Sequence, residues 1–151
     1  MTSIVYHHES KTLAVDGRMC CDGVIELDNY NKIHTNSAGV WVMAGDVSDI
    51  EEFVNLKDNE SMSGDSASVS GYLVNNGQMF YVCLGDDLKR RMYKNEHNSA
   101  DGSGRKFALS AMDFGCGAVD AIKYAAKKDI FTGGEIQVVD VKTGLITKVD
   151  E

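Results

Sequence analysis

The sequence predicts an α+β domain in which helices pack on the outer faces of two antiparallel sheets. Two observations predict this class. Apolar segments of strand length occur in groups, in the order strands, one helix, strands, two helices, strands. An Asn-Gly pair joins two of these strands directly, which is typical of an antiparallel hairpin. Strands grouped in this way favour layered antiparallel sheets over a parallel sheet with alternating helices.

The first strands are predicted from apolar residues near the N-terminus. Segments Ser3–His7 and Leu13–Asp16 are joined by a polar turn at residues 9–11, so they should form an antiparallel pair. Another short extended segment begins at Lys32. Gly39–Gly45 is an apolar run of strand length, typical of a strand that is buried on both faces.

A helix is predicted directly after this run. Ser48 and Glu51 have the spacing of a capping box, so the helix should begin near Ser48. Three apolar residues continue at helical spacing: Ile50, Phe53 and Val54. Lys57–Asp65 is polar and is predicted to be a loop, which leaves a single helix in this part of the chain.

The middle of the chain carries a strong hairpin signal. Asn75-Asn76-Gly77 separates two apolar runs, Ser68–Val74 and Gln78–Leu84, and Asn and Gly both adopt positive φ readily. The next segment, Asp86–Asp101, is polar and irregular, and we assign no helix or strand to it. Lys89-Arg90-Arg91 within it is interpreted as a solvated surface run.

Two helices and a final hairpin complete the prediction. The first helix should end at Gly115, and its apolar face comprises Phe107, Ala108, Ala111 and Met112. The second should end at Lys127-Lys128, which complement the helix dipole, and its apolar stripe comprises Ala118, Ile122, Ala125 and Ala126. Glu135–Val141 and Leu145–Val149 are predicted to pair over a turn at residues 142–144.

Composition and charge exclude several classes of function. The net charge of −8 argues against sequence-independent binding to nucleic acid or anionic membranes, because both need clustered Lys and Arg. No run approaches the roughly 18 apolar residues of a membrane span, and we recognise no signal peptide, so we expect a cytoplasmic protein. The length favours a single domain over residues 1–151.

We expect neither a metal site nor a cofactor site. The cysteines, Cys20, Cys21, Cys83 and Cys116, lack C-x-x-C spacing and are interpreted as reduced thiols. The histidines lack metal-ligand spacing as well. Gly102-Ser103-Gly104 follows a polar segment rather than a clear strand, so it is a weak candidate for a phosphate-binding loop.

The N-terminus carries the first candidate for chemistry. Removal of Met1, which a small second residue permits, would leave Thr2 with a free α-amine. This amine, with an ordinary pKa of about 7.7–8, is a base that covalent geometry places beside the threonine hydroxyl, itself a poor nucleophile. Many proteins begin with Met-Thr, so Thr2 alone is a weak indication.

Three other residues strengthen this indication. Asp16 ends the strand antiparallel to the first, so its carboxylate can return close to Thr2, and Lys32 offers a cation for it. Gly45 lies where a strand gives way to a helix and offers an unobstructed backbone N–H, as an oxyanion hole requires. Each also has an ordinary structural interpretation: Asp16 as a turn residue, Lys32 as a surface charge and Gly45 as a loop glycine.

Taken together, these segments resemble the proteasome β-type subunits, with the compactness of the bacterial HslV peptidase. The resemblance rests on six segments in the family's order: residues 2–5, 14–18, 32–33, 44–46, 102–104 and 128–134. The last segment is the most specific. Its Asp129-Ile130-Phe131-Thr132-Gly133-Gly134 is similar to the Asp-x-x-Ser/Thr-Gly-Gly that follows the second central helix of these peptidases.

The resemblance implies the four-layer αββα fold of N-terminal-nucleophile hydrolases and a threonine peptidase activity. It implies that Thr2 is the nucleophile and, through its amine, the general base. Lys32 would lower the pKa of this amine, Asp16 would pair with Lys32, and the Gly45 N–H would bind the oxyanion. Three further residues would hydrogen-bond around the N-terminus: Ser103, Asp129 and Thr132.

The resemblance also implies partners. Substrates would be unfolded polypeptides or peptides, the subunits would self-associate into a ring or an open oligomer, and an AAA+ unfoldase is a candidate partner. Lys57–Ala67, where the family has a second long helix, is a departure that bears on ring size, as is Asp86–Asp101. Residues near Cys20-Cys21 and Met43–Val47 would line the pocket beside the nucleophile and favour apolar substrate side chains.

Two alternatives to the peptidase stay open. One is a catalytically silent ring subunit or scaffold of the same fold. The other is an amidohydrolase that acts on a small amide. The joint presence of Thr2, Asp16 and Lys32 favours an active peptidase, because a silent subunit would have little need of all three.

Overall fold

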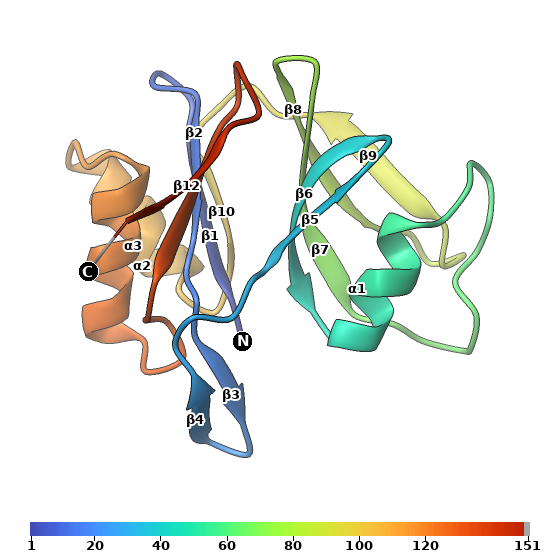
Figure 1. Cartoon of the computed structure of the whole chain (residues 1–151), viewed down its shortest axis with the longest axis horizontal. Helices are drawn as coiled ribbons and strands as arrows, with labels where there is room; N and C mark the ends of the chain where they lie inside the picture. Colours follow the sequence, from blue (N-terminus) through green and yellow to red (C-terminus); the bar gives the residue numbers. More distant parts are fainter. Residues whose placement is uncertain (150–151) are drawn as a thin grey trace.

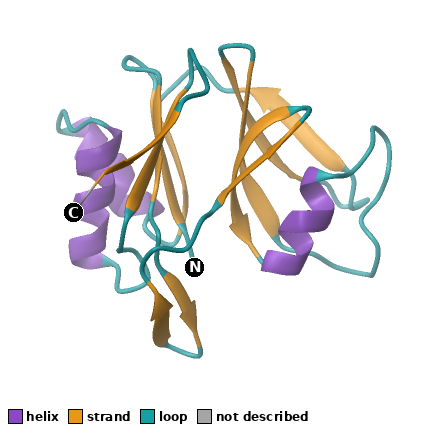
Figure 2. Cartoon of the chain, in the orientation of Figure 1, coloured by secondary structure: helices purple, strands orange, loops and turns teal. Residues whose placement is uncertain are grey.

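Two antiparallel sheets stand face to face between two layers of helices (Figure 1). The computed structural model describes residues 1–149. Helices α2 and α3 cover the outer face of one sheet and α1 covers the outer face of the other (Figure 2). The helices are α1 (Val47–Val54), α2 (Arg105–Asp113) and α3 (Ala118–Lys128). The layer order α-β-β-α confirms the predicted fold class. Within residues 1–149, no helix is long and apolar enough to cross a membrane.

Within residues 1–149, each sheet has five strands and a small hairpin stands apart from both. The sheet under α2 and α3 has the order β10-β1-β2-β11-β12. Its strands are β1 (Ser3–His7), β2 (Thr12–Val15), β10 (Ser99–Gly102), β11 (Ile136–Asp140) and β12 (Ile146–Val149). The sheet under α1 has the order β5-β6-β7-β8-β9. Its strands are β5 (Ile33–Asn36), β6 (Gly39–Gly45), β7 (Val69–Asn75), β8 (Gln78–Leu84) and β9 (Arg90–Lys94). The separate hairpin pairs β3 (Met19–Cys21) with β4 (Val24–Leu27).

Strands predicted from apolar residues agree with the structure. β1, β6 and β8 have the predicted bounds, and the other predicted strands begin or end one residue away. β6 is buried on both faces as expected: Trp41 packs in the cluster under α1, and Val42 packs in the cluster between the sheets. Asn76 and Gly77 have φ values of 50° and 76°, which confirms the hairpin between β7 and β8.

Four strands were not predicted: β3, β4, β9 and β10. β9 and β10 lie in the segment expected to be irregular. β9 is an edge strand whose side chains are mostly exposed and charged, so it lacks an apolar pattern. β10 buries one apolar residue, Ala100, and is defined by its pairing with β1. Both strands exist because of tertiary pairing, which local patterns do not reveal.

Helix α1 begins earlier than predicted, and the predicted capping box of Ser48 and Glu51 does not form. The N-cap is Asp46, no side chain caps the helix, and Val47 is the first helical residue. The backbone N–H of Asp46 donates instead to the carbonyl of Ser68 in the neighbouring segment. The helix therefore starts directly from the turn at the end of β6. Its apolar residues at helical spacing are buried as predicted: Ile50, Phe53 and Val54.

Small residues let α2 and α3 pack closely on the first sheet. The buried helix residues are Ala108, Ala111, Met112, Ala118, Ala121, Ile122 and Ala125, and they contact Val5, Ala14 and Ile136 of the sheet. Gly115 has a φ of 100° and follows the end of α2, as predicted. Phe107 was expected on the buried face but is 38% exposed.

Arg90 is a structural residue rather than part of a solvated run. Its guanidinium donates to the carbonyl of Phe53 at 2.8 Å and to that of Leu56 at 3.1 Å, at the C-terminal end of α1. It also lies 5.0 Å from the ring centroid of Trp41. These contacts bind carbonyls at the C-terminal end of α1, where the helix itself supplies few N–H donors. Arg91 fits the original prediction, because it is exposed and pairs with Asp87.

Replacing Arg90 should therefore destabilise the fold. Because Arg90→Ala removes charged hydrogen bonds and an aromatic contact, we expect the free energy of unfolding in urea to fall by about 1.5–3 kcal/mol. Arg90→Lys should recover only part of this, since an ammonium lacks the planar fork. Arg91→Ala is the matched control and should change stability by less than about 0.5 kcal/mol. Equal unfolding midpoints for Arg90→Ala and Arg91→Ala would contradict the assignment.

Candidate active site

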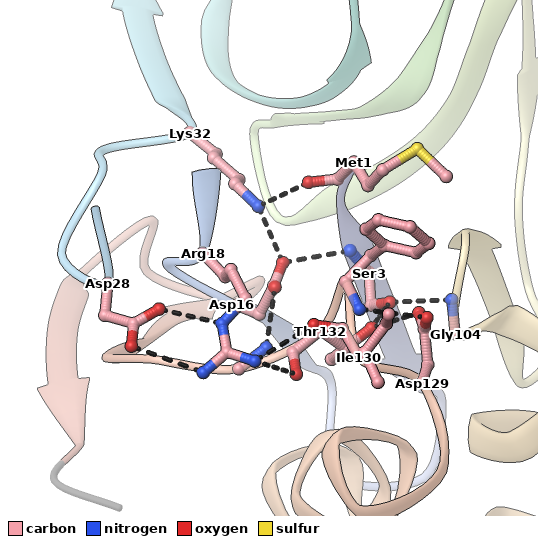
Figure 3. Close-up of polar contacts among 12 residues, drawn as sticks. Met1, Ser3, Asp16, Arg18, Asp28, Lys32, Gly104, Asp129, Ile130 and Thr132 are labelled. Carbon is pink, nitrogen blue, oxygen red and sulfur yellow. Dashed lines mark hydrogen bonds and ion pairs between the residues drawn. The ribbon is translucent and has the colours of Figure 1, made fainter. Parts of the chain in front are cut away.

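The carboxylate of Asp16 is the centre of a buried polar cluster at the N-terminus (Figure 3). The antiparallel register of β1 and β2 places Asp16, one residue after β2, opposite Ser3. One carboxylate oxygen accepts the Ser3 N–H at 2.9 Å and the Lys32 ammonium at 2.8 Å. The other accepts the Gly133 N–H at 3.1 Å. Asp16 therefore connects three segments that are distant in sequence.

Lys32 lies between Asp16 and the N-terminal peptide. It is 4% exposed and directly precedes β5. Besides Asp16, its Nζ donates to the Met1 carbonyl at 3.0 Å, and that carbonyl is bonded to the nitrogen of Thr2. Burial lowers the pKa of Lys32, and the Asp16 carboxylate opposes this by favouring the charged form. The Lys32 ammonium thus lies beside the Met1–Thr2 peptide bond, which would be cleaved when Met1 is removed.

The backbone around Thr2 is fixed on both sides. Thr2 is 8% exposed, and its carbonyl accepts the Ser103 N–H at 2.8 Å. On the other side the next N–H, that of Ser3, is held by Asp16. Gly102 has a φ of 93°, and a Cβ there would collide with the Thr2 carbonyl, so the close approach requires glycine.

The segment after α3 supplies a second carboxylate. The Thr132 hydroxyl donates to Asp129 at 2.6 Å, and the Phe131 N–H donates to the other carboxylate oxygen at 3.1 Å. Burial raises the pKa of Asp129. Four groups oppose this effect and hold the pKa below its ordinary value: the nearby Ser103 hydroxyl, the Thr132 hydroxyl, the Phe131 N–H and the N-terminal ammonium of Met1. Among the described residues, the buried Ser103 hydroxyl has no partner in hydrogen-bond geometry.

Arg18 holds this segment from the other side. Its guanidinium forms a two-point ion pair with Asp28, at 2.8 and 3.2 Å, and donates to the Ile130 carbonyl at 3.0 Å. A Cβ on Gly133 would lie 2.6 Å from the centre of this guanidinium, so a side chain at position 133 would displace Arg18 from these contacts. Arg18 and Gly133 thereby fix the backbone N–H that binds Asp16.

A small pocket opens beside Thr2. Thr2, Lys32 and Gly45 contribute to its wall, and the apolar part of the wall is formed by Met19, Met43, Val47 and Ile50. Met1, Arg18, Tyr30 and His34 complete it. Burial lowers the pKa of His34, against the effect of Glu51. The wall includes Met19, next to Cys20, and three residues of Met43–Val47, which are the two regions expected to line it, whereas Cys20 and Cys21 themselves are not in the wall.

The structure brings the predicted residues together in two groups. Thr2, Lys32 and Gly45 meet at the pocket, with Asp16 bonded to Lys32. Asp129 and Thr132 are bonded to each other, and Ser103 contacts Thr2 through its backbone. Three residues that hold the cluster lie in the segments that resemble the family but were assigned no role in the site from the sequence: Ser3, Arg18 and Gly133. A hydroxyl, a cation, the buried carboxylate of Asp16 and the half-buried one of Asp129 at a strand N-terminus are components suited to nucleophilic catalysis.

Comparison with known proteins gives two close sequence relatives. Proteasome subunit beta 2 of Pyrococcus furiosus is 31% identical over an alignment of 169 positions, gaps included, which covers 88% of this chain and 82% of the relative. Proteasome subunit beta 2 of Pyrococcus abyssi is 29% identical over 85% of this chain and 80% of the relative. No family profile matches the sequence.

Solved structures share the fold across the whole chain. Thiobacillus denitrificans BPH, in complex with epoxomicin, has a TM-score of 0.65 at 17% identity and covers 100% of both chains. The eukaryotic HslV from Trypanosoma brucei has a TM-score of 0.64 at 15% identity, over 91% of this chain and 97% of its own. The sequence relatives and the shared N-terminal-nucleophile fold lead to one conclusion: the chain belongs to the proteasome β-subunit family.

Proposed function

We propose that the protein is a threonine-type endopeptidase subunit of an HslV- or proteasome-like protease, with Thr2 as nucleophile once Met1 is removed. One observation carries the proposal. The Lys32 ammonium bridges the buried Asp16 carboxylate and the carbonyl attached to the Thr2 nitrogen, at 2.8 and 3.0 Å. A cation fixed in this position lies next to the amine that removal of Met1 would create.

The free amine of Thr2 would be the general base. Its ordinary pKa is about 7.7–8, and the adjacent Lys32 ammonium favours the neutral amine by like-charge repulsion. Asp16 keeps Lys32 charged and in place. Asp129, Thr132 and Ser103 would hold the amine from the opposite side.

Catalysis would follow two steps. The Thr2 hydroxyl attacks the substrate carbonyl while its proton passes to the amine, and the Gly45 N–H stabilises the oxyanion. The amine then gives this proton to the leaving nitrogen as the C–N bond breaks, which leaves an ester on Thr2. Water attacks the ester and the amine takes up its proton. The amine then returns this proton to Thr2 Oγ as the acyl C–O bond breaks, which releases the carboxylic acid and restores the hydroxyl.

The proposal extends to partners of the same kind as those expected from the sequence. Substrates would be unfolded polypeptides or peptides, processed in a ring or an open oligomer of this subunit, with an AAA+ unfoldase as candidate partner. Within residues 1–149, α1 is the single helix on the outer face of the β5–β9 sheet, and a loop connects it to β7, where the family has a second long helix. This face therefore offers less helical surface for contacts between subunits than it does in the family.

A silent scaffold subunit is the second candidate, and it requires that Met1 stays attached. With Met1 attached, the Thr2 nitrogen is an amide and cannot act as a base, and the Met1 carbonyl takes a hydrogen bond from Lys32. A chain that retains Met1 would keep the fold without the chemistry.

Reaction with epoxomicin separates these two functions. Because an epoxyketone consumes both the hydroxyl and the free amine of an N-terminal threonine, intact-mass spectrometry should show a chain without Met1 that gains the full mass of one inhibitor. Thr2→Ala, also permissive for Met1 removal, should neither gain mass nor cleave peptides, while Thr2→Ser should retain some of both. Light scattering on the same sample gives the assembly mass.

Each result of this experiment is decisive. A chain that lacks Met1 but is not labelled would refute the threonine peptidase, and an unlabelled chain that retains Met1 would support the scaffold. Peptide cleavage by Thr2→Ala at the wild-type rate would refute the choice of nucleophile.

Removing the Lys32 charge should change the pH dependence. In Lys32→Ala the amine loses its like-charged neighbour and faces an unpaired Asp16, so its pKa rises. The acid limb of kcat/KM, measured with a fluorogenic peptide, should move to higher pH, with turnover nearly lost at neutral pH and partly regained above about pH 8. The double variant Asp16→Asn/Lys32→Ala removes the unpaired carboxylate and should shift the limb less. If the acid limbs of the kcat/KM profiles are identical in wild type and in both variants, and the variants are folded, Lys32 is not the group that lowers the pKa of the Thr2 amine.

The pocket beside Thr2 should select apolar side chains on the amino side of the cleaved bond. Met19, Met43, Val47 and Ile50 offer no partner for a buried charge, and the two basic side chains of the wall, Arg18 and Lys32, are already paired with carboxylates. Peptides with Leu or Met there should therefore have kcat/KM roughly tenfold or more above those with Asp or Lys. Val47→Lys tests the assignment because Val47 is 51% exposed and tolerates a long side chain. It should improve cleavage after acidic residues, and an unchanged preference would place the selecting pocket elsewhere.

A further inference from the structure

A continuous chain of hydrogen bonds connects the start of α2 with the segment after α3. The Gly104 N–H donates to Ser3 Oγ at 2.8 Å, Ser3 Oγ lies 2.6 Å from Thr132 Oγ1, and Thr132 Oγ1 donates to Asp129 at 2.6 Å. Ser3 and Thr132 are 0% exposed. Figure 3 shows the four residues side by side.

The direction of every proton in this chain is determined. A hydroxyl has one proton, and that of Thr132 goes to the Asp129 carboxylate. Ser3 must therefore be the donor in its contact with Thr132, and its remaining capacity accepts the Gly104 N–H. All donors point toward the carboxylate.

We propose that Ser3 is a positioning residue of the Thr2 site. Its hydroxyl, held by the Gly104 N–H, fixes the rotation of the Thr132 hydroxyl and thereby the Asp129 carboxylate. Asp129 in turn lies close enough to the N-terminal ammonium of Met1 for that charge to lower its pKa. This inference rests on the proposed function, because it assigns Ser3 a part in orienting the amine of Thr2.

The space around the chain supports a specific role for the two hydroxyls. A Cβ on Gly104 would lie 2.5 Å from Ser3 Oγ and 2.9 Å from Thr132 Oγ1. Glycine at this position thus allows the backbone to approach both oxygens. The N–H of Gly104 would lose its buried acceptor if Ser3 were alanine.

A double-mutant cycle tests the proposal. Ser3→Ala and Thr132→Val each break the chain, so each should lower kcat by about tenfold or more with little change in KM, since the pocket wall is untouched. Because both act through Asp129, the double variant should be no slower than the slower single variant. Ser3→Thr keeps the hydroxyl and should restore most of kcat. The matched control is Ser110→Ala, whose hydroxyl contacts only a helix carbonyl at the surface, and it should leave kcat unchanged.

Two outcomes of the cycle would overturn the proposal. The first is a kcat of Ser3→Ala equal to that of Ser110→Ala. The second is independent losses, so that the double variant is slower by the product of the two single factors.

A second measurement does not depend on activity. Because its donors lower the pKa of Asp129 below 3.8, they contribute stability that is present above this pH and is lost as pH falls through the pKa of the folded state. If Ser3 supports these donors, the difference in Tm between wild type and Ser3→Ala should be largest above pH 5 and should narrow by about 2–4 °C in acid. A Tm difference independent of pH would mean that Ser3 only fills space, and would overturn the proposal.

The two measurements separate the two proposals. If wild type neither cleaves peptides nor reacts with epoxomicin, the proposed function fails. The hydrogen-bond chain is then judged by the Tm difference alone.

Discussion

The buried carboxylate of Asp16 is the interaction on which the geometry of the N-terminus depends. Asp16 is 1% exposed, and an ionised carboxylate in such a place is tolerated only with partners that replace water. Those partners come from β1, from the residue before β5 and from the segment after α3. Removing one partner of a buried ion pair costs about 3–5 kcal/mol. The fold is therefore strongly biased toward the one arrangement in which the three segments meet.

The turn Asp16-Gly17-Arg18 binds the segment after α3 through two oppositely charged side chains. Asp16 binds the backbone N–H of Gly133, while Arg18 binds the carbonyl of Ile130 and is itself held by Asp28. Opposite charges two residues apart thus clamp the segment after α3 through its backbone. The side chains of Asp129 and Thr132 stay available for each other and for the N-terminus.

Much of the fold could be predicted because the central strands and the helices carry regular apolar patterns. β6 has apolar residues on both faces, and α3 has small residues at helical spacing. β10 and β9 could not be predicted in this way, because their existence depends on the partner strand rather than on their own side chains. In the same way, the sequence around Arg90 indicates only a surface charge, because its structural role depends on a tertiary contact with the Phe53 carbonyl of α1.

The candidate site also has a part that local sequence patterns predict and a part that depends on tertiary contacts. The proximity of Asp16 to the N-terminus follows from a short antiparallel pair, which local sequence reveals. The contribution of residues 129–134 came only from resemblance to a family, because no local pattern indicates that they return to β1. Ser3 was missed because a serine at the start of an apolar strand looks like any small residue until its neighbours are known.

The long span of these contacts has a consequence for synthesis of the chain. Ser3 and Thr132 are 129 positions apart, and Asp16 and Gly133 are 117 apart. Residues 2 and 3 leave the ribosome long before their partners exist, and contacts of such separation form late in folding. An incomplete chain thus carries the hydroxyl of Thr2 without the groups that surround it. A truncated chain that ends before Asp129 therefore has Thr2 but lacks the carboxylate and hydroxyl, of Asp129 and Thr132, that lie beside Ser3 in the complete fold.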